Sequence, residues 1–354
     1  MAQQQGAKPS MISEIGLAIF VILLIVLLIC EPPPIVVNFA ISFNITLGIL
    51  LLMISLYIQR PLELASFPSI ILLGTMFRLV LSIASTRLIL AKGEAGEVID
   101  AFGNFVTGGS LVVGFVIFII ITIVQFMVIT KGAERIAEVA ARFALDAMPG
   151  KQMQIDGDFN QGLISPEEAA KRRDDLARES NLYGSMDGAM KFVKGDTIAG
   201  IIIVVINIVG GLCVGILMNG MQPAEAVQKY TVLTIGDGLA SQLPSLLMSI
   251  SAGIVMTRST ASGSSLGGDL AGQILNKPSS LIFTVVFLVF IALTGFITGL
   301  PWYTFTVYAL VILAAFLIVS VNKDVQSQLG QLESVKRSMS DLTNPNRMYE
   351  RLGV

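Results

Sequence analysis

The sequence predicts an all-α membrane protein that crosses the bilayer several times. Hydrophobic residues make up 54% of the chain and charged residues only 14%, whereas about 25% charged residues is usual in a soluble domain. Several charge-free stretches are long enough to cross the hydrocarbon core, which takes about 20 apolar residues in a helix. A transmembrane barrel would show short segments of alternating hydrophobicity, and these stretches do not alternate.

We predict eight membrane-spanning helices from these stretches. They cover residues 12–30, 35–58, 66–90, 108–130, 197–218, 234–256, 280–298 and 302–320. Three consecutive prolines, Pro32 to Pro34, separate the first two spans, and Gly299-Leu300-Pro301 separates the last two, because proline ends a helix. Trp302 and Tyr303 are typical of a membrane interface and fit this second turn.

The distribution of basic residues predicts that both termini lie in the cytoplasm. With the N-terminus inside, 19 of the 23 lysines and arginines fall in cytoplasmic segments. Only Lys92 and Lys229 fall outside, while Arg78 and Arg87 remain within the third span. Cytoplasmic loops of membrane proteins normally carry this excess of basic residues.

We expect four parts along the chain. Residues 1–130 hold a polar tail and four spans, 131–196 a charged cytoplasmic subdomain, 197–322 four more spans, and 323–354 a polar cytoplasmic linker. The segment 131–196 contains 10 of the 23 basic and 12 of the 25 acidic residues. This density of charge between apolar blocks indicates a small helical subdomain between the fourth and fifth spans.

Within this segment we predict three short helices. The first, Lys131–Ala147, continues the fourth span and should end at Pro149-Gly150. The second begins at Ser165-Pro166-Glu167-Glu168, a capping box with proline at the first helical position, and reaches about Ser180.

The third helix, Leu182–Val193, leads into the fifth span. It places Asp187 and Lys191 four residues apart, a spacing that favours an ion pair. Upstream, the acidic residues from Asp156 to Glu167 have the spacing of a calcium-binding loop, but position six is Gln161 where glycine is needed, so this match is weak.

Four charged residues in or beside the spans are candidates for function. Arg78 lies near the middle of the third span, where an arginine costs about 2.5–3.5 kcal/mol on insertion scales, so it should have a buried partner. Arg87 lies about half a turn round from it and either reaches the outer interface or pairs with Asp237, at similar depth in the sixth span. Asp237 and Asp196 could instead be N-caps, and Asp196 could also accept a proton or cation.

Other site types have little support. The chain has no histidine, which excludes His-based metal sites and His-dependent triads. Cys30 and Cys213 lie at or in apolar runs, so a disulfide is not indicated. There is no phosphate-binding loop, dinucleotide fingerprint or nucleophile–base pair. We expect neither enzymatic activity nor a cofactor, a metal or a nucleic-acid partner. Gly211 with Gly215, and Gly295 with Gly299, have the spacing that permits close helix packing.

Two long stretches resemble the FHIPEP family. They are GAERIAEVAARFALDAMPGKQMQID at 132–156 and YGSMDGAMKFVKGDTIAGIII at 183–203. ASTRLIL at 84–90 and LTIGDGLASQLPSLLMSISAGIVMTR at 233–258 look like the same family, so the resemblance covers nearly all of 12–260. FHIPEP proteins are export-gate proteins of bacterial type III secretion, in flagella and in injectisomes. Gln125 and Glu134 look more like the injectisome branch.

The resemblance implies a multi-pass protein of the bacterial inner membrane with eight membrane helices. It implies assembly into a nonameric ring with other membrane proteins of the export apparatus, and use of the proton motive force. Members also have a large C-terminal cytoplasmic domain that docks chaperones, secreted substrates and the secretion ATPase complex. We expect this chain to stop near where that domain would begin.

The family's functional residues can be placed in this sequence. Those important for export fall on Arg78, Arg87, Lys191, Asp196 and Asp237. Those of the cytoplasmic loop motif, where we expect subunit contacts, fall on Arg135, Arg142 and Asp146.

The sequence therefore predicts an export-gate subunit that couples proton flow to the translocation of unfolded proteins. In this hypothesis, protonation of Asp196 changes the docking of the adjacent cytoplasmic segment. The alternative is a secondary transporter or channel for ions or small solutes, for which internal repeats and broken helices are typical. No repeat is visible, although Pro244 could break the sixth span. A receptor or scaffold would not need Arg78 or Asp237 in the membrane.

Overall fold

The computed structural model describes residues 11–258, 278–298 and 301–317. The regular elements in these ranges are all helices, which confirms the predicted all-α class. The chain forms two compact units, Met1–Gly263 and Ser264–Val354.

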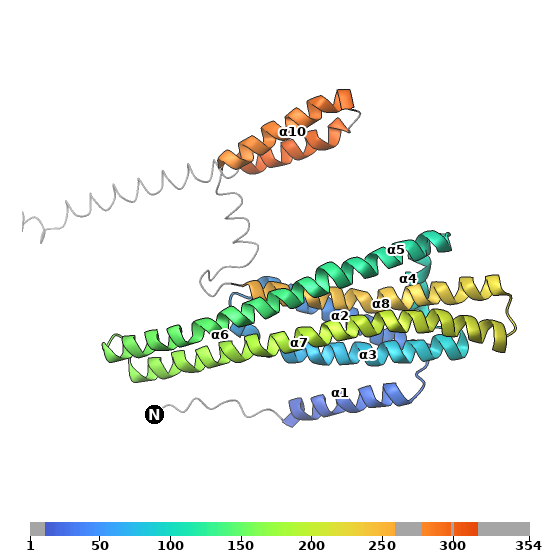
Figure 1. The fold of residues 1–354 in the computed structure, drawn as a ribbon, viewed down its shortest axis with the longest axis horizontal. Coiled ribbons are helices and arrows are strands. Elements are labelled where there is room, and N and C mark those ends of the chain that lie inside the picture. Colours follow the sequence, from blue (N-terminus) through green and yellow to red (C-terminus); the bar gives the residue numbers. More distant parts are fainter. Residues whose placement is uncertain (1–10, 259–277, 299–300, 318–354) are drawn as a thin grey trace, which may run out of the picture. The chain divides into compact units, whose positions relative to one another are not determined.

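The helices of the first unit pack lengthwise (Figure 1). In chain order they are α1 (Met11–Ile29), α2 (Pro34–Tyr57), the short 3₁₀ helix η1 (Pro61–Leu64), α3 (Phe67–Lys92), α4 (Glu97–Thr107), α5 (Leu111–Val124), the π-helix η2 (Gln125–Thr130), α6 (Lys131–Asn160), α7 (Pro166–Cys213), the π-helix η3 (Val214–Met218) and α8 (Pro223–Thr257). The second unit contains α10 (Pro278–Thr298) and an apolar helix over Trp302–Leu317.

In the described part of the chain, five helices are long and apolar enough to cross a membrane. They are α2, η1 with α3, α8, and the composite helices Leu111–Asn160 and Pro166–Met218. Shorter apolar helices, Ile15–Ile29, Ser279–Thr294 and Trp302–Leu317, lie at the three remaining predicted spans. The chain is thus an all-α, multi-pass membrane protein, while the number of eight spans stays a prediction.

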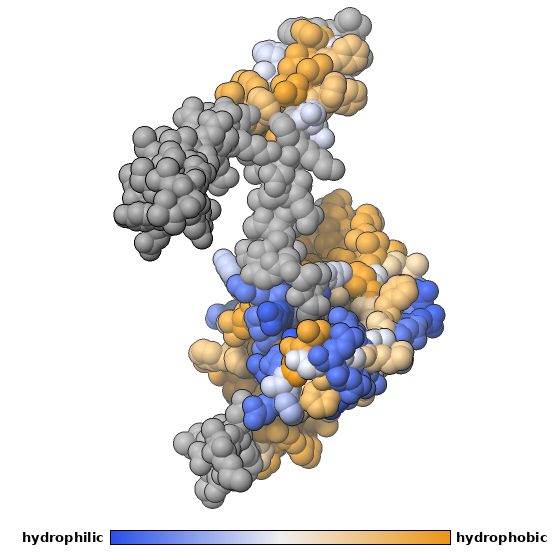
Figure 2. Space-filling model, turned by 90° about the vertical axis from the view of Figure 1, so that its left-hand side faces the viewer, coloured by the Kyte–Doolittle hydropathy of each residue, from blue (hydrophilic) through white to orange (hydrophobic). Residues whose placement is uncertain are grey.

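Two of these helices are much longer than a bilayer is thick. Leu111–Asn160 has 50 residues and Pro166–Met218 has 53, so each is about 75–80 Å long, whereas the hydrocarbon core measures about 30 Å. Their charged halves, α6 and the first part of α7, lie side by side and extend past the ends of α2, α3 and α8 (Figure 1). Figure 2 looks onto this end, where hydrophilic surface gathers.

The predicted division of this hairpin into three short helices is wrong. α6 continues through Pro149 to Asn160, and α7 runs from Pro166 to Cys213 with no interruption near residues 180 or 193. The start of α7 was predicted correctly, since Ser165 Oγ accepts a hydrogen bond from the Glu168 amide at 3.2 Å. The Asp187–Lys191 ion pair is also present, at 2.8 Å.

Contacts with α7 explain why α6 does not end at the proline. Beyond it, Lys151 pairs with Glu179 at 3.1 Å, and Ile155 is buried with Ala169 and Leu176. Farther along, Asp156 and Asp158 pair with Arg173 and Arg172 at 2.5 and 3.5 Å. A proline costs about 3 kcal/mol inside a helix, and tertiary packing of this kind can offset that local cost.

The bundle is centred on α3, α7 and α8, which contact one another. α8 also packs against α4, a helix that the sequence analysis did not predict. The two backbones touch at glycines: a Cβ on Gly236 of α8 would lie 2.0 Å from the Ile99 carbonyl oxygen, and one on Gly103 of α4 would lie 2.4 Å from the Val232 oxygen. This crossing holds the part of α8 that carries Asp237.

The Gly211 and Gly215 spacing serves packing within the chain. A Cβ on either glycine would lie within 2.7 Å of the Tyr230 ring, which is fully buried. Gly299 lies outside the described residues, so the second glycine pair cannot be placed. α8 continues through Pro244 to Thr257, so the predicted break in the sixth span does not occur.

Candidate functional site

Buried and half-buried polar side chains line the meeting of α3, α7 and α8. We call them the polar seam: Arg78, Ser82 and Ser85 of α3, Asp196 and Asn207 of α7, and Asp237, Ser241 and Ser245 of α8. The three seam residues of α3 are spaced by four and three positions, so they lie on one face of that helix. The three seam residues of α8 are spaced by four positions each and also share one face. Most of the seam is uncharged, so it is compatible with an apolar surrounding.

An ion pair between Arg78 and Asp196 joins α3 to α7 inside the seam. Both side chains are only 5% exposed. A second guanidinium nitrogen of Arg78 donates to the Ser241 carbonyl of α8 at 3.4 Å, so this arginine contacts all three helices. The predicted buried partner of Arg78 is therefore confirmed. The N-cap interpretation of Asp196 is wrong, because Asp196 lies inside α7.

Asp237 accepts hydrogen bonds from neutral groups. Ser85 Oγ donates to one carboxylate oxygen at 2.5 Å and Asn207 Nδ2 donates to the other at 3.3 Å. The side chain is buried inside α8, which begins at Pro223, so Asp237 is not an N-cap. In the described ranges no ion pair reaches Asp237, which leaves a buried acid without a basic partner.

Arg87 does not pair with Asp237 as predicted. Its guanidinium donates to the carbonyls of Ile29 and Leu28, at 2.8 and 3.0 Å. These carbonyls belong to the last turn of α1, where the helix leaves its backbone oxygens without internal partners. The forked guanidinium satisfies two of them at once, so Arg87 caps α1.

Two small cavities lie along the seam. The larger measures about 30 Å³ and the smaller about 10 Å³. Arg78, Ser82 and Ser241 line both cavities, while Asp196 lines the larger and Asp237 the smaller. The two carboxylates therefore lie at opposite ends of one polar, partly hollow region.

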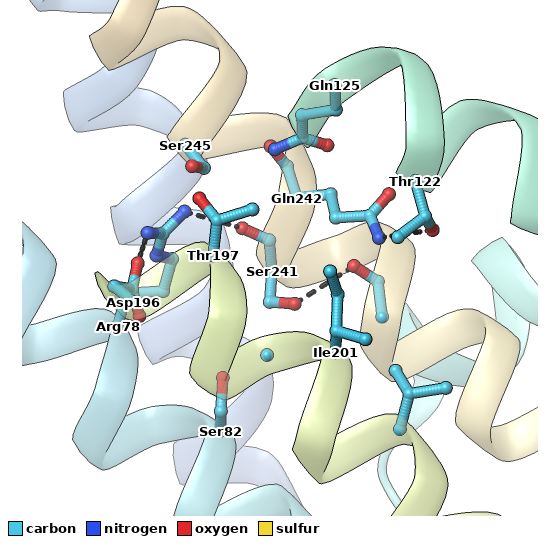
Figure 3. Close-up of a pocket in the computed structure, with 13 residues that line it drawn as sticks. Arg78, Ser82, Thr122, Gln125, Asp196, Thr197, Ile201, Ser241, Gln242 and Ser245 are labelled. Atoms are coloured by element: carbon cyan, nitrogen blue, oxygen red, sulfur yellow. Dashed lines mark hydrogen bonds and ion pairs between the residues drawn. The ribbon is translucent and has the colours of Figure 1, made fainter. Parts of the chain in front are cut away.

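A pair of glutamine side chains borders the larger cavity. Gln125 Nε2 donates to the Gln242 carbonyl at 3.0 Å, and Gln242 Nε2 donates to Thr122 Oγ1 at 2.8 Å. In Figure 3 these three residues lie on one side of the cavity, and Arg78 and Asp196 on the other. The sequence analysis missed Gln242 and Thr122, although amides and hydroxyls in charge-free spans could have indicated them.

Two backbone carbonyls of α8 close to Pro244 accept hydrogen bonds from side chains of other helices. They are those of Ser241 and Gln242, which accept from Arg78 and Gln125. The carbonyl that the proline itself leaves without its helical partner is that of Ala240, four residues before it. Side chains from neighbouring helices often bind backbone groups beside a proline in a membrane helix.

The other predicted site residues lie outside the seam. Lys191 is exposed on α7 and pairs with Asp187. Arg135 pairs with Glu138 at 2.6 Å on the exposed side of α6, and Arg142 and Asp146 are exposed on the same helix. The structure thus brings together only Arg78, Asp196 and Asp237.

A metal site is not found in the part of the chain that the structure describes: it contains no group of three His, Cys, Asp or Glu side chains that could hold an ion. The two acids at the start of the calcium-like loop, Asp156 and Asp158, are paired with arginines. Cys30 and Cys213 are free and exposed.

Comparison with known proteins relates nearly the whole chain to one family. Residues 15–352 match the model of the FHIPEP family. The chain is 48% identical over 325 residues to the low calcium response locus protein D of Yersinia pestis, a match that covers 89% of this chain and 46% of that protein. It is 44% identical over 351 residues to the harpin secretion protein HrpI of Erwinia amylovora, covering 95% of this chain and 49% of the relative.

A third relative is the probable translocation protein y4yR of Sinorhizobium fredii. The identity is 50% over 303 residues, 85% of this chain and 43% of that protein. The chain therefore spans about half the length of the curated relatives it matches. No solved structure matches it.

Proposed function

Because the chain belongs to the FHIPEP family, we propose that it is an export-gate subunit of a bacterial type III secretion system. Relatives named for harpin secretion and for translocation support this role. Since the chain spans only about half of these relatives, the activity of the whole protein is part of the proposal. The subunit lies in the inner membrane with both termini in the cytoplasm, in keeping with the distribution of basic residues.

The proposed work of the subunit is to couple proton flow to protein translocation. The observation that carries this proposal is the buried Arg78–Asp196 pair. Protonation of Asp196 removes its charge and with it the attraction that holds α7 to α3. Because α7 is one helix from Pro166 to Cys213, a movement at Asp196 reaches the cytoplasmic hairpin directly.

The magnitudes are compatible with this coupling. Removing one partner of a buried ion pair costs about 3–5 kcal/mol. One elementary charge that crosses a potential of 100 mV releases about 2.3 kcal/mol. Two protons, at about 4.6 kcal/mol, therefore supply free energy of the size needed to break and restore the pair.

The second buried acid fits a proton path. Asp237 has neutral partners, so no basic side chain among the described residues offsets the cost of burying its charge. Ser82 and Ser241 line both the cavity beside Asp237 and the cavity beside Asp196. We assign Asp237 to the outer end of the path and Asp196 to the inner end.

Partners follow from the family and from exposed surfaces. We propose that copies of the chain form a nonameric ring, with contacts at the exposed Arg135, Arg142 and Asp146 of α6. Other membrane proteins of the export apparatus and the secreted proteins are further partners. Chaperones and the secretion ATPase complex are also proposed partners of the whole protein. In this proposal Lys191 stabilises the hairpin through its pair with Asp187. Arg87 holds the end of α1 through two backbone carbonyls.

The decisive test replaces Asp196 with Asn, which is close in shape and cannot change charge. We expect Asp196→Asn to abolish export while the ring still assembles. Asp174→Asn is the matched control, because Asp174 lies on the same helix and makes only an exposed ion pair, with Arg178 at 2.8 Å. Normal export by the Asp196 variant would rule out the proposed coupling.

The alternative function is a secondary transporter or channel for ions or small solutes. The buried acids and arginine of the seam suit it equally, but α8 is not broken at Pro244, and broken helices are typical of such transporters. Particle symmetry separates the two functions: a large ring supports the export gate, and a monomer or dimer supports the transporter.

A further inference from the structure

Two buried oxygens at the larger cavity have no hydrogen-bond partner in the protein. They are Gln242 Oε1 and Ser245 Oγ, and both residues line the cavity. Ser245 is only 1% exposed. A buried polar atom left without a partner costs about 1–3 kcal/mol, so such atoms are normally satisfied by an ordered water.

The orientation of the Gln242 amide follows from its neighbour. The Thr122 hydroxyl donates its hydrogen to the Phe118 carbonyl at 2.8 Å. Its oxygen can therefore only accept from Gln242, and only the amide nitrogen can donate. The NH₂ group of Gln242 must face Thr122, which leaves Oε1 turned to the other side as an acceptor.

The size and charge of the cavity indicate which molecule it holds. A volume of about 30 Å³ has room for one or two waters, since a single water needs at least about 10–15 Å³ on this measure. Arg78 and Asp196 are the charged residues that line the cavity. The positive charge of Arg78 balances the negative charge of Asp196. The cavity therefore has no net charge that would favour a metal ion or an anion. A neutral molecule that both donates and accepts hydrogen bonds fits.

We infer that this cavity is a water-binding site in which Gln242 and Ser245 hold one or two waters beside Asp196. The role of these waters rests on the proposed function: they are the route by which Asp196 exchanges its proton. A water that transfers a proton to the carboxylate forms the new O–H bond there and loses one of its own. It must then take a proton from the next hydrogen-bonded group, so the route needs a continuous series of donors.

Ser249 supplies the next member of this series. It lies one turn beyond Ser245 on α8, about 6 Å along the helix. Its hydroxyl is buried, with the residue 0% exposed, and it also has no protein partner. By contrast, Ser251 is equally buried, but its hydroxyl donates to the Leu247 carbonyl at 2.7 Å. Unpartnered hydroxyls thus follow α8 in one direction beyond the residues that line the cavity.

The water site is tested directly by a structure of the full-length protein in lipid nanodiscs at a resolution that shows waters. We expect density within hydrogen-bond distance of Gln242 Oε1 and Ser245 Oγ, and loss of this density in Gln242→Leu. An empty cavity in the wild-type protein would overturn the inference. So would a peak that appears in sodium chloride and disappears in choline chloride, because such a peak is a metal ion.

The role of the waters is tested by export driven by a proton gradient. We expect Ser245→Ala combined with Gln242→Leu to lower the export rate about tenfold, as the loss of the two groups that hold the waters predicts. Ser251→Ala is the matched control and should export normally. Thermal unfolding of each variant shows whether it is folded, and Ser245→Ala alone serves if the double variant is not.

The outcomes distinguish this inference from the proposed function. If Asp196→Asn abolishes export but the double variant is folded and exports normally, the water route is wrong and the coupling role of Asp196 stands. If the water density is present but Asp196→Asn exports normally, the site exists and the proposed function is wrong.

Discussion

Arg78 of α3 and Asp196 of α7 form an ion pair whose two side chains are each 5% exposed. The pair lies in a polar seam that otherwise consists of four serines, Asn207 and Asp237. Buried pairs are weak contributors to stability, because the cost of desolvation nearly offsets the attraction. The Arg78–Asp196 pair therefore adds little to the stability of the fold, and protonation of Asp196 would remove its attraction. Such a pair is suited to switching the contact between α3 and α7.

The first prediction separates the stability of this pair from its function. Asp196→Leu alone leaves the Arg78 guanidinium buried without its partner and should destabilise the protein by about 3–5 kcal/mol. Adding Arg78→Met should restore most of the loss, because apolar replacement of a buried pair is often neutral or stabilising. The midpoint of thermal unfolding in detergent measures both effects.

Export is the second readout of these variants. The variant with both Asp196→Leu and Arg78→Met should be stable but unable to export. Its apolar side chains fill the space of the ion pair, but it has no carboxylate at position 196 to accept a proton. Recovery of export would contradict the coupling role, and failure to recover stability would contradict the direct contact between the two residues.

A second prediction concerns Arg87. Arg87→Gln removes a charged donor from two carbonyls of α1, and hydrogen bonds to charged groups contribute about 1.5–3 kcal/mol. Amide hydrogens in α1 should therefore exchange faster. Lys92→Gln is the control, because Lys92 makes an exposed pair with Glu31 at 3.0 Å and such pairs contribute about 0–1 kcal/mol.

Charge-reversal variants test the pairing of Arg87 with Asp237 that the sequence suggested. Charge reversal at Arg87 and Asp237 together should not rescue either single reversal, because the structure places their side chains on different partners. Rescue by the double reversal would show that the cap on α1 is not the main contact of Arg87.

The contrast between Arg78 and Arg87 shows what could be predicted of the site from the sequence. The cost of a charge in a membrane is a local property, so the need for a buried partner at Arg78 was predictable. The identity of each partner was not, because it depends on how α1, α3, α7 and α8 are placed. Matched depth suggested Asp237 for Arg87, whereas the carbonyls at the end of α1 carry no signal in the sequence.

The helices show a similar limit. Hydrophobicity predicted the spanning regions and Ser165 the start of α7, because both signals are local. Pro149 was misread as a helix end, since the ion pairs and apolar contacts that carry α6 past it come from residues about 15–30 positions away in α7. α4 was missed because it is short and amphipathic and lies beside an apolar run.

A third prediction uses the crossing of α4 and α8. Gly236→Ala would place a Cβ 2.0 Å from the Ile99 carbonyl oxygen, which requires the two backbones to separate. We expect a fall in the unfolding temperature and reduced export, because Asp237 is the next residue. Gly253→Ala on the same helix has no atom within 4 Å of the new Cβ and should stabilise the helix by up to about 1 kcal/mol. Equal effects of the two substitutions would contradict the close crossing.

The last prediction tests whether α7 transmits movement from the membrane to the hairpin. Ser185 is exposed on the part of α7 that belongs to the hairpin, and it lies 11 residues, or about 16 Å, from Asp196. Ser185→Pro should interrupt the helix at a cost of about 3 kcal/mol or more without touching the seam. We expect the Arg78–Asp196 pair to form normally and export to be strongly reduced. Ser185→Ala keeps the helix continuous and should export normally. A structure of the proline variant checks the pair, and full export by that variant would show that the signal from Asp196 does not travel along α7.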